Sequence, residues 1–301
     1  VMATPAFDDN TLYVPGGDLR VYAYAADTGA LRWTSEQLPG AAIRDYWLVA
    51  SHGTVIATTQ FARGCHDTYR ALEAAMMKAF RVENEGKMLV QEPLLAKVKE
   101  WMETHPEYRS MHLLNAADGA LGAIPPLIQV HGGGCTGPLP TIAPDGTAYA
   151  VHANVRLSAS GWAFVSRLDL KTGVLDPLIK GRYWVSDKEW EWQAAPGTKL
   201  SGRSTFDVGF CVNDQSWGIS MAGTRVFAVR DAGWAAGQMA HSYIDVVTGE
   251  DGWVGDDRGR NEAGRGSFGG AFHATCSPMV ISDNNIFHKT TRNVVLCFEG
   301  N

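Results

Sequence analysis

The chain has 301 residues, with 26 Lys and Arg against 32 Asp and Glu, and its formal net charge of −6 is spread along the sequence. This balance argues against a nucleic acid or an anionic membrane surface as the main partner. Because 45% of the residues are hydrophobic and only 19% are charged, the chain can bury a large core. No apolar run of about 18 residues occurs, so we expect no transmembrane segment. The sequence also starts without a signal-peptide pattern, and we expect any such signal to lie upstream or to have been removed.

A first pattern recurs along the chain: an apolar strand, a tight polar turn and a second apolar strand. In chain order its turns lie at Asp9-Asn10, Gly53, Asp145-Gly146, Gly223 and Asn284-Asn285. Residues of these types adopt the positive φ that a two-residue hairpin turn needs at little cost. The pattern therefore predicts five β-hairpins.

A second pattern follows the hairpins: a further apolar strand, an Asp/Thr/Gly turn and a return strand. Its turn glycines are Gly29, Gly119, Gly173 and Gly249. Trp33 and Trp253 stand four residues after the first and last of these glycines, where Ala123 and Pro177 stand in the other two copies. A large ring at that place suits packing between neighbouring sheets, and we predict packing rather than ligand binding for both. The spacing fits about 45 residues per unit plus insertions, which is typical of a four-stranded propeller blade.

Joined together, the two patterns resemble the PQQ-like repeat of the quinoprotein-type β-propellers, most closely over residues 4–33. The resemblance implies an all-β fold: a β-propeller of four-stranded antiparallel blades, with about five recognisable repeats, in a single domain over residues 1–301. It also implies a bacterial protein of the periplasm or the extracellular space. It does not specify the function, because this family includes quinone-dependent dehydrogenases, outer-membrane assembly factors and proteins without a known role.

The repeats in the sequence do not add up to a closed ring of blades. Four repeats are complete, and a fifth begins at Ser277 and stops at "VVLCFEGN", where its final strand should begin. Propellers of this family usually have seven or eight blades, so we expect either part of a longer protein or an unusually small or irregular ring. An incomplete ring would expose two sheet faces and their edges. We therefore expect a protein partner or a missing propeller segment.

Residues 68–108 interrupt the second repeat with a helical pattern. Apolar and aromatic residues recur at helical spacing at Tyr69, Leu72, Met76, Phe80, Leu94, Val98, Trp101 and His105. The pattern predicts two amphipathic helices inserted into the second blade. They would either cover a blade edge or act as a lid or partner-docking element.

Two further segments are candidates for ligand binding. In "GRYWVSDKEWEWQ", Trp184, Trp190 and Trp192 stand among acidic residues, which predicts an edge strand with one aromatic and one acidic face. This strand would serve either blade packing or binding of a sugar ring or peptide. The Gly-rich segment "DDRGRNEAGRGSFGG" is either a solvated loop or an anion-binding loop at the ring axis. Its basic residues are Arg258, Arg260 and Arg265.

Three short clusters contain residues that can ligate a metal. They are His66 and Asp67 after Cys65, His131 with Cys135, and His273 with Cys276. Imidazole with thiolate or carboxylate would suit zinc or copper, and loops from every blade could meet at one face. The alternative is that nine histidines produce such neighbours by chance.

The five cysteines include no CxxC and no adjacent pair, which excludes a covalent haem of the CxxCH type. The adjacent Cys-Cys pair that resembles the cofactor-covering disulfide of PQQ alcohol dehydrogenases is also missing. In an exported protein we expect some cysteines to pair, with Cys276–Cys297 and Cys65–Cys135 as candidates.

No enzymatic motif accompanies the repeats: there is no GxSxG, no GxGxxG opening a helix and no Walker loop. We therefore expect a non-catalytic scaffold that binds a protein or another ligand, such as a small molecule or glycan. The alternative is a quinoprotein-like oxidoreductase, or another enzyme that uses the central funnel. PQQ with calcium would need a Trp floor, basic groups and oxygen ligands, and no motif supports that arrangement.

Overall fold

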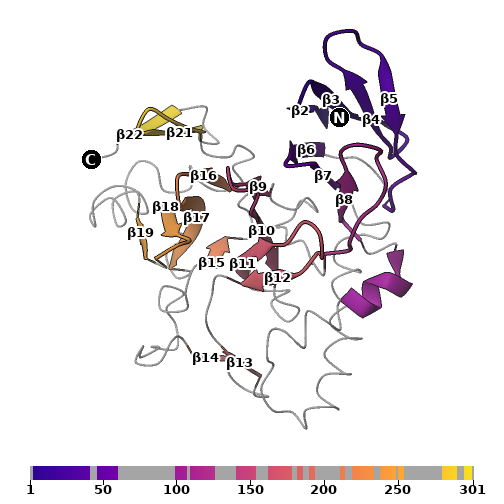
Figure 1. Cartoon of the computed structure of the whole chain (residues 1–301). Helices are drawn as coiled ribbons and strands as arrows, with labels where there is room; N and C mark the ends of the chain where they lie inside the picture. The colour runs from indigo at the N-terminus through magenta and orange to yellow at the C-terminus, as the bar shows by residue number, and fades with distance from the viewer. Residues whose placement is uncertain are drawn as a thin grey trace.

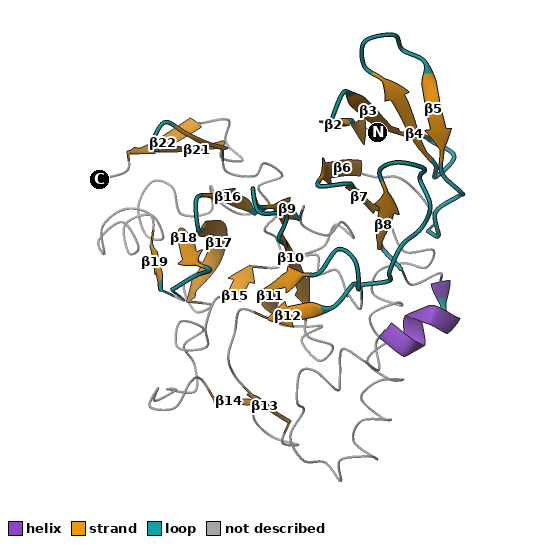
Figure 2. Cartoon of the chain, viewed as in Figure 1, coloured by secondary structure: helices purple, strands orange, loops and turns teal. Residues whose placement is uncertain are grey.

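A computed structural model describes part of the chain, and every structural statement below concerns that part. It comprises residues 3–40, 46–59, 99–106, 109–125, 140–153, 162–177, 182–185, 190–193, 211–213, 219–233, 238–248, 250–253, 280–289 and 295–299. The regular secondary structure of these residues is almost entirely β-strand, and residues 99–104 are helical (Figure 2). The expected all-β fold is confirmed.

The strands form small sheets that follow one another in chain order along an arc (Figure 1). The first sheet contains β2 (Ala6–Asp8), β3 (Thr11–Pro15), β4 (Val21–Ala25) and β5 (Leu31–Thr34). The second contains β1 (Ala3–Thr4), β6 (Tyr46–Ser51), β7 (Thr54–Thr58) and β8 (Met111–Asn115). The third contains β9 (Thr141–Ile142), β10 (Ala148–Ala153), β11 (Trp162–Leu168), β12 (Leu175–Pro177) and β15 (Cys211–Asn213). The fourth contains β16 (Ser220–Ala222), β17 (Arg225–Gly233), β18 (Gln238–Asp245) and β19 (Asp251–Trp253), and the last contains β20 (Val280–Ser282), β21 (Asn285–Lys289) and β22 (Val295–Glu299).

The first two hairpin turns have the positive φ that the sequence predicts, whereas residues 143–147 join the third hairpin in place of a two-residue turn, since Ile142 pairs with Ala148. Both residues of Asp9-Asn10 have positive φ, at 42° and 54°, and so do both residues of His52-Gly53, at 50° and 75°. Such a pair twists in the same sense as the strands that it joins. The last hairpin departs from the expected position by one residue: its turn is Asp283-Asn284, and Asn285 already belongs to β21.

The turns that lead to the fourth strands also repeat. The amide of each turn glycine donates to the carbonyl four residues earlier at 2.8 Å, from Gly29 to Ala25, Gly119 to Asn115 and Gly173 to Asp169. In the fourth sheet, Asp245 accepts hydrogen bonds from the Thr224 hydroxyl and the amides of Val247 and Thr248. These bonds stabilise the carboxylate, with the Thr224 bond first, and lower the pKa of Asp245 to about 2.

The first strands of the sheets are neighbours, as in a β-propeller. β1 pairs in parallel with β6, through Ala3 with Tyr46 and Thr4 with Trp47. Contacts then run from β2 to β6, from β6 to β9, from β9 to β16 and from β16 to β20. Each of these five sheets is therefore a blade, and its first strand lies beside the first strand of the next blade. The last blade has three strands among the described residues.

Each blade has two faces, which we name the following face, toward the next blade in the chain, and the preceding face. Residues of β3 alternate between these faces, and Thr11, Tyr13 and Pro15 are buried on the following face. One core lies between the first and second blades and a second between the second and third. The first core contains Tyr13, Val21, Ala23, Trp33, Leu38, Leu48, Val55, Ala57 and Leu114, and the second contains Ile56, Met111, Leu113, Ala148, Ala150, Leu168 and Leu175.

Trp33 is a packing residue, as predicted. Its ring is 9% exposed, and its Nε1 donates to the Ala116 carbonyl of the second blade at 2.9 Å. It lies directly on Gly119, where a Cβ atom would be 2.5 Å from Trp33 Cε3. The same relation recurs one blade later, where a Cβ on Gly173 would be 3.0 Å from the Ile124 carbonyl oxygen and 3.2 Å from Ala123 Cβ. The side chain of Trp253 lies outside the described residues.

The two ends of the blades differ in their connections. At one end, which we name the tight-turn end, β-hairpins and closing turns connect the strands, and hydrogen bonds join the two turns of a blade, as from Ala26 N to Asn10 O and from Ala116 N to Gly53 O. At the opposite end, which we name the long-loop end, the second strand of each blade leads to the third, and the fourth leads to the next blade. The connections from the second strand to the third and from one blade to the next therefore begin and end at the long-loop end. The connection from β12 to β15 differs, because it leaves the outer edge of the third blade opposite Ser166 and rejoins it opposite Phe164.

Candidate functional site

The metal and anion candidates fall in connections that begin and end at the long-loop end, whereas the tryptophans fall in the connection from β12 to β15 at the outer edge of the third blade. The connection from β7 to β8 contains His66 and Asp67, and the connection from the second to the third blade contains His131 and Cys135. The segment between β12 and β15 contains the three tryptophans Trp184, Trp190 and Trp192. The connection from β19 to β20 contains Arg258, Arg260, Arg265, His273 and Cys276.

The metal and anion candidates lie outside the described residues. These are His66, Asp67, His131, Cys135, His273 and Cys276 for the metal, and Arg258, Arg260 and Arg265 for the anion. Within the described part of the chain, no group of three or more His, Cys, Asp or Glu could hold a metal ion. Cys297 is a free, exposed thiol, and Cys276, its expected disulfide partner, lies outside the described residues.

The tryptophan segment forms a hairpin rather than one edge strand. β13 (Arg182–Val185) pairs with β14 (Trp190–Gln193), with Tyr183 opposite Trp192 and Val185 opposite Trp190. Residues directly opposite each other share a face, and faces alternate along a strand. Trp190 and Trp192 therefore share one face with Tyr183, whereas Trp184 belongs to the other face, opposite Glu191. The single aromatic face expected for all three tryptophans is corrected to a face with two of them.

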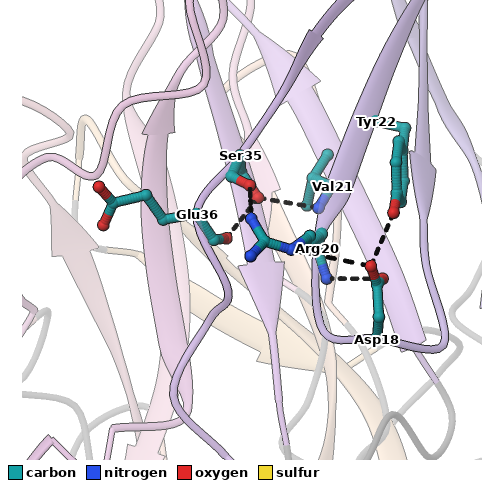
Figure 3. Close-up of polar contacts among 6 residues, drawn as sticks. All are labelled: Asp18, Arg20, Val21, Tyr22, Ser35 and Glu36. Atoms are coloured by element: carbon teal, nitrogen blue, oxygen red, sulfur yellow. Dashed lines mark hydrogen bonds and ion pairs between the residues drawn. The ribbon is translucent and has the colours of Figure 1, made fainter.

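A polar cluster of described residues lies at the long-loop end of the first blade (Figure 3). Tyr22 donates its hydroxyl proton to Asp18 Oδ2 at 2.7 Å, and Arg20 lies 3.8 Å from the same carboxylate. The hydrogen bond from Tyr22 is the main reason that the pKa of Asp18 is lowered, and the same bond raises the pKa of Tyr22. Arg20 also donates to the Ser35 carbonyl at 2.7 Å, which ties the loop between β3 and β4 to the chain leaving β5.

This cluster continues into the second blade through backbone contacts. The amide of Leu38 donates to the Leu19 carbonyl at 2.8 Å, and Leu38 is 1% exposed. Its neighbour Pro39 offers a carbonyl to the Thr59 hydroxyl, which donates at 2.7 Å. Residues 38–39, in the chain that leaves the first blade, therefore contact both the first and the second blade at the long-loop end.

Among the described titratable groups at this end, His112 has a strongly lowered pKa. It lies in β8, is 4% exposed, and its Nε2 is 2.9 Å from Thr59 Oγ1. The Thr59 hydroxyl donates its proton to the Pro39 carbonyl. His112 therefore carries its proton on Nε2 and donates it to Thr59 Oγ1, so that the carbonyl, the hydroxyl and the imidazole each have a partner. Burial, and secondarily the charge of Arg109, lower the pKa of His112 to about 3. The imidazole is therefore neutral and stays in the interior at ordinary pH.

Arg109, whose charge acts on His112, also holds the helical residues 99–104 in place. Met102 is 1% exposed, and the side chain of Arg109 donates from Nε to the Met102 carbonyl at 2.7 Å and from Nη2 to the Glu103 carbonyl at 3.0 Å. Those carbonyls belong to the last turn of the helix, where a cation is favourable. Trp101 and His105 stack at 4.3 Å, as their helical spacing predicts. The rest of the predicted insertion, except for residue 106, lies outside the described residues.

Sequence reasoning missed the Thr59–His112 pair. The two residues are 53 positions apart, and although His112 lies in the strand that leads to the turn at Gly119, a histidine does not recur there in the first copy, which has Tyr22. The only available signal was a His among apolar residues in "MHLLN", a strand in which four of the five residues are buried. The two side chains are in contact only because β7 and β8 are adjacent in the blade.

The sheets and the contacts between their first strands define an all-β protein of the β-propeller class. No family model matches the sequence, and no curated protein matches it. Among solved structures, the chain is similar to the computationally designed Ika8 protein, with 10% identity and a TM-score of 0.42 over 98% of this chain and 70% of that one. It is also similar to BamB from Moraxella catarrhalis, with 13% identity and a TM-score of 0.43 over 98% of this chain and 57% of that one.

A third similar structure is the quinohemoprotein alcohol dehydrogenase from Comamonas testosteroni, with 13% identity and a TM-score of 0.48 over 98% of this chain and 41% of that one. The chain thus spans little more than half of BamB and about two-fifths of the dehydrogenase. The fold assignment rests on the sheets and their contacts described above. None of the helices in the described part of the chain is long and apolar enough to cross a membrane.

Proposed function

We propose that the protein is a non-catalytic β-propeller scaffold of the PQQ-like repeat family, which binds a protein or another ligand through its long-loop end. The observation that carries this proposal is the difference between the two ends of the blades. Short, hydrogen-bonded turns close the tight-turn end, whereas the long connections within the second blade and between blades begin and end at the long-loop end. Variable loops on a rigid sheet framework are a common location of binding sites.

The proposed contact groups are the basic residues of the long-loop end and the tryptophans of the β13–β14 hairpin, which lies in the connection from β12 to β15. Trp190 and Trp192 share a face of the β13–β14 hairpin, which would suit stacking against a sugar ring or a peptide side chain. Arg258, Arg260 and Arg265 would supply positive charge for an anionic group. The clusters with His66 and Asp67, His131 and Cys135, and His273 and Cys276 remain candidates for a metal. The resemblance of the repeats supports a place in the bacterial periplasm or the extracellular space.

The aromatic face can be tested by Trp fluorescence. Titration with cellohexaose and with a flexible aromatic-rich peptide should quench or shift the emission in a saturable manner for one of the two probes. Trp190→Ala and Trp192→Ala should remove this response. Trp184→Ala is the matched control, because Trp184 belongs to the other face of the same hairpin and its loss should leave the affinity unchanged. Equal losses in all three variants would contradict the platform.

The competing enzymatic function can be tested directly. Incubation with calcium and PQQ, followed by absorbance and by reduction of a dye with ethanol as substrate, should give neither saturable cofactor binding nor turnover. Saturable binding with turnover would overturn the non-catalytic proposal and establish a quinoprotein-like oxidoreductase. The fluorescence titration and this assay use different readouts, so either result stands without the other.

A further inference from the structure

We propose that the aromatic face of the β13–β14 hairpin binds a proline-rich segment of a partner protein in the polyproline II conformation. This inference rests on the proposed function, because it uses the same hairpin and assigns one class of peptide as its ligand. Among the described strands, β13 and β14 pair only with each other, as a two-stranded sheet (Figure 1). A sheet of two strands is marginally stable in water and gains stability when its apolar face is covered.

The pairing of β13 with β14 divides their residues into two faces of different chemistry. Residues opposite each other share a face, and residues two apart in one strand share it too. The aromatic face consists of Tyr183, Val185, Trp190 and Trp192. The other face consists of Arg182, Trp184, Glu191 and Gln193. All charged groups and the one carboxamide of the two strands therefore belong to the second face.

The polar groups of the aromatic face are two indole N–H groups and one phenol hydroxyl. An indole N–H only donates, and a phenol hydroxyl can donate. The face therefore offers ring surfaces and hydrogen-bond donors, without a carboxylate or an amide. A proline-rich segment has the matching groups, because each proline has a ring and a carbonyl acceptor but no amide hydrogen. In polyproline II these carbonyls make no internal hydrogen bonds and are available to a partner.

The spacing of the tryptophans also fits this conformation. Trp190 and Trp192 are two positions apart in β14, so their backbone positions are separated by about 6.4–6.8 Å. Two residues of a polyproline II helix span about 6.2 Å. Prolines at positions n and n+2 of a ligand therefore repeat at nearly the same distance as the two tryptophans. Such a segment is already extended when free, so it loses little conformational entropy when it binds to an aromatic surface.

Two other ligand classes fit this face less well. The hydroxyl groups of a sugar both donate and accept, so a glycan site needs acceptors beside its rings, and Glu191 and Gln193 belong to the other face. A lipid surface would require the end of the hairpin to leave water. The four residues 186–189 that connect the strands include three charged ones, which makes that transfer costly.

The first test compares probes on the unmodified chain. Decaproline has no fluorescence of its own, so titration with it can be followed by Trp emission. We expect a saturable change with decaproline, at an affinity at least tenfold higher than that of the flexible aromatic-rich peptide, and no saturable change with cellohexaose. Because the face and the probe are uncharged, the affinity should change by less than about twofold between about 0.05 and 0.5 M salt.

The second test uses variants of the hairpin. Trp190→Ala and Trp192→Ala should each weaken decaproline binding at least tenfold. Trp192→Phe keeps a ring and removes only the N–H donor, so it should weaken binding by a smaller factor, about two- to tenfold. Trp184→Ala is the matched control on the other face and should leave the affinity unchanged. Circular dichroism and thermal melts compare the folding of all variants, and Trp192→Phe keeps the test valid if an alanine variant unfolds.

The outcomes separate this inference from the proposed function. If cellohexaose binds and decaproline does not, and Trp190→Ala abolishes that binding, the inference is overturned while the binding platform stands. The same holds if decaproline binds no more tightly than the flexible peptide. If no probe gives a saturable change, both the inference and the platform are overturned. Equal weakening of decaproline binding by Trp184→Ala would also overturn the inference, because the response would then not depend on the aromatic face.

Discussion

The two ends of the first two blades are stabilised in different ways. At the tight-turn end, one aromatic ring, Trp33, fills the space between the blades and lies on a glycine. At the long-loop end, the corresponding space holds a buried polar network of Thr59, His112 and the Pro39 carbonyl beside the helical residues 99–104. The first arrangement follows from a repeat, whereas the second is specific to this pair of blades. The repeated positions therefore determine how the blades pack, whereas the loops determine the contacts that are specific to this protein.

The largest expected effect is at the tight-turn end. Trp33→Ala removes a 9% exposed ring and the hydrogen bond to Ala116 and should lower the free energy of unfolding by about 3–5 kcal/mol. Denaturant unfolding monitored by circular dichroism measures the loss. Ala123 occupies the equivalent position in the second blade, and Ala123→Gly should cost far less because only one methyl group is removed. Similar losses in the two variants would show that Trp33 does not dominate its interface.

A pair of glycine substitutions sharpens this comparison. Gly119 and Gly29 have nearly the same backbone, with φ of +74° and +70°, so alanine at either position carries the same strain of about 1–2 kcal/mol. Only at Gly119 would the new Cβ atom meet the Trp33 ring, at 2.5 Å. We expect Gly119→Ala to destabilise the protein by about 1 kcal/mol or more beyond Gly29→Ala, since overpacking adds to strain. In the double variant with Trp33→Ala, the difference should vanish.

At the long-loop end, stability should depend on pH through His112. Its folded pKa of about 3 lies below the unfolded value of 6.5, so the unfolded state binds the proton first as the pH falls. The free energy of unfolding should therefore decrease below pH 6.5, by about 2 kcal/mol at pH 5 relative to pH 8. His112→Gln should remove this contribution, and the difference between the two pH profiles isolates it from the other titrating groups. Parallel profiles would contradict a buried neutral imidazole.

The smallest effect is expected for Ser35→Ala. Ser35 Oγ accepts from the buried amide of Val21 at 2.9 Å and donates to the Glu36 carbonyl at 2.7 Å (Figure 3). Its removal leaves the Val21 amide unpaired and should cost about 1 kcal/mol in denaturant unfolding. Ser35→Thr, which keeps the hydroxyl, is the control and should retain most of that stability.

Sequence alone predicted the blades well because their determinants are local. Turn residues such as Asp9-Asn10 and Gly29 impose their backbone within a few positions, and the alternation in β3 assigns each side chain to a face. The position of Trp33, four residues after its turn glycine, was sufficient to predict its packing.

The candidate site could be predicted only in part, because its determinants are not local. Whether Trp184 shares a face with Trp190 depends on the register of the β13–β14 hairpin, and alternation within one segment cannot supply that register. β15 was also missed: it pairs with the first half of β11, whereas β12 pairs with the second half, so two distant segments share one edge of the third blade. The Thr59–His112 pair likewise depends on strand adjacency.

Pro5 stands between β1 and β2, where the chain passes from one blade to another: Ala3 and Thr4 pair with β6, and Ala6 to Asp8 pair with β3. Proline has no amide hydrogen to donate to a ladder, so this is the point at which one extended segment can change partners. During synthesis on the ribosome, Ala6 to Asp8 can pair as soon as β3 has emerged. Ala3 and Thr4 must wait until the whole first blade and β6 have left the exit tunnel. The parallel pairing of Ala3 and Thr4 with β6 therefore forms late, and the time at which it forms shows the order in which the nascent chain acquires its structure.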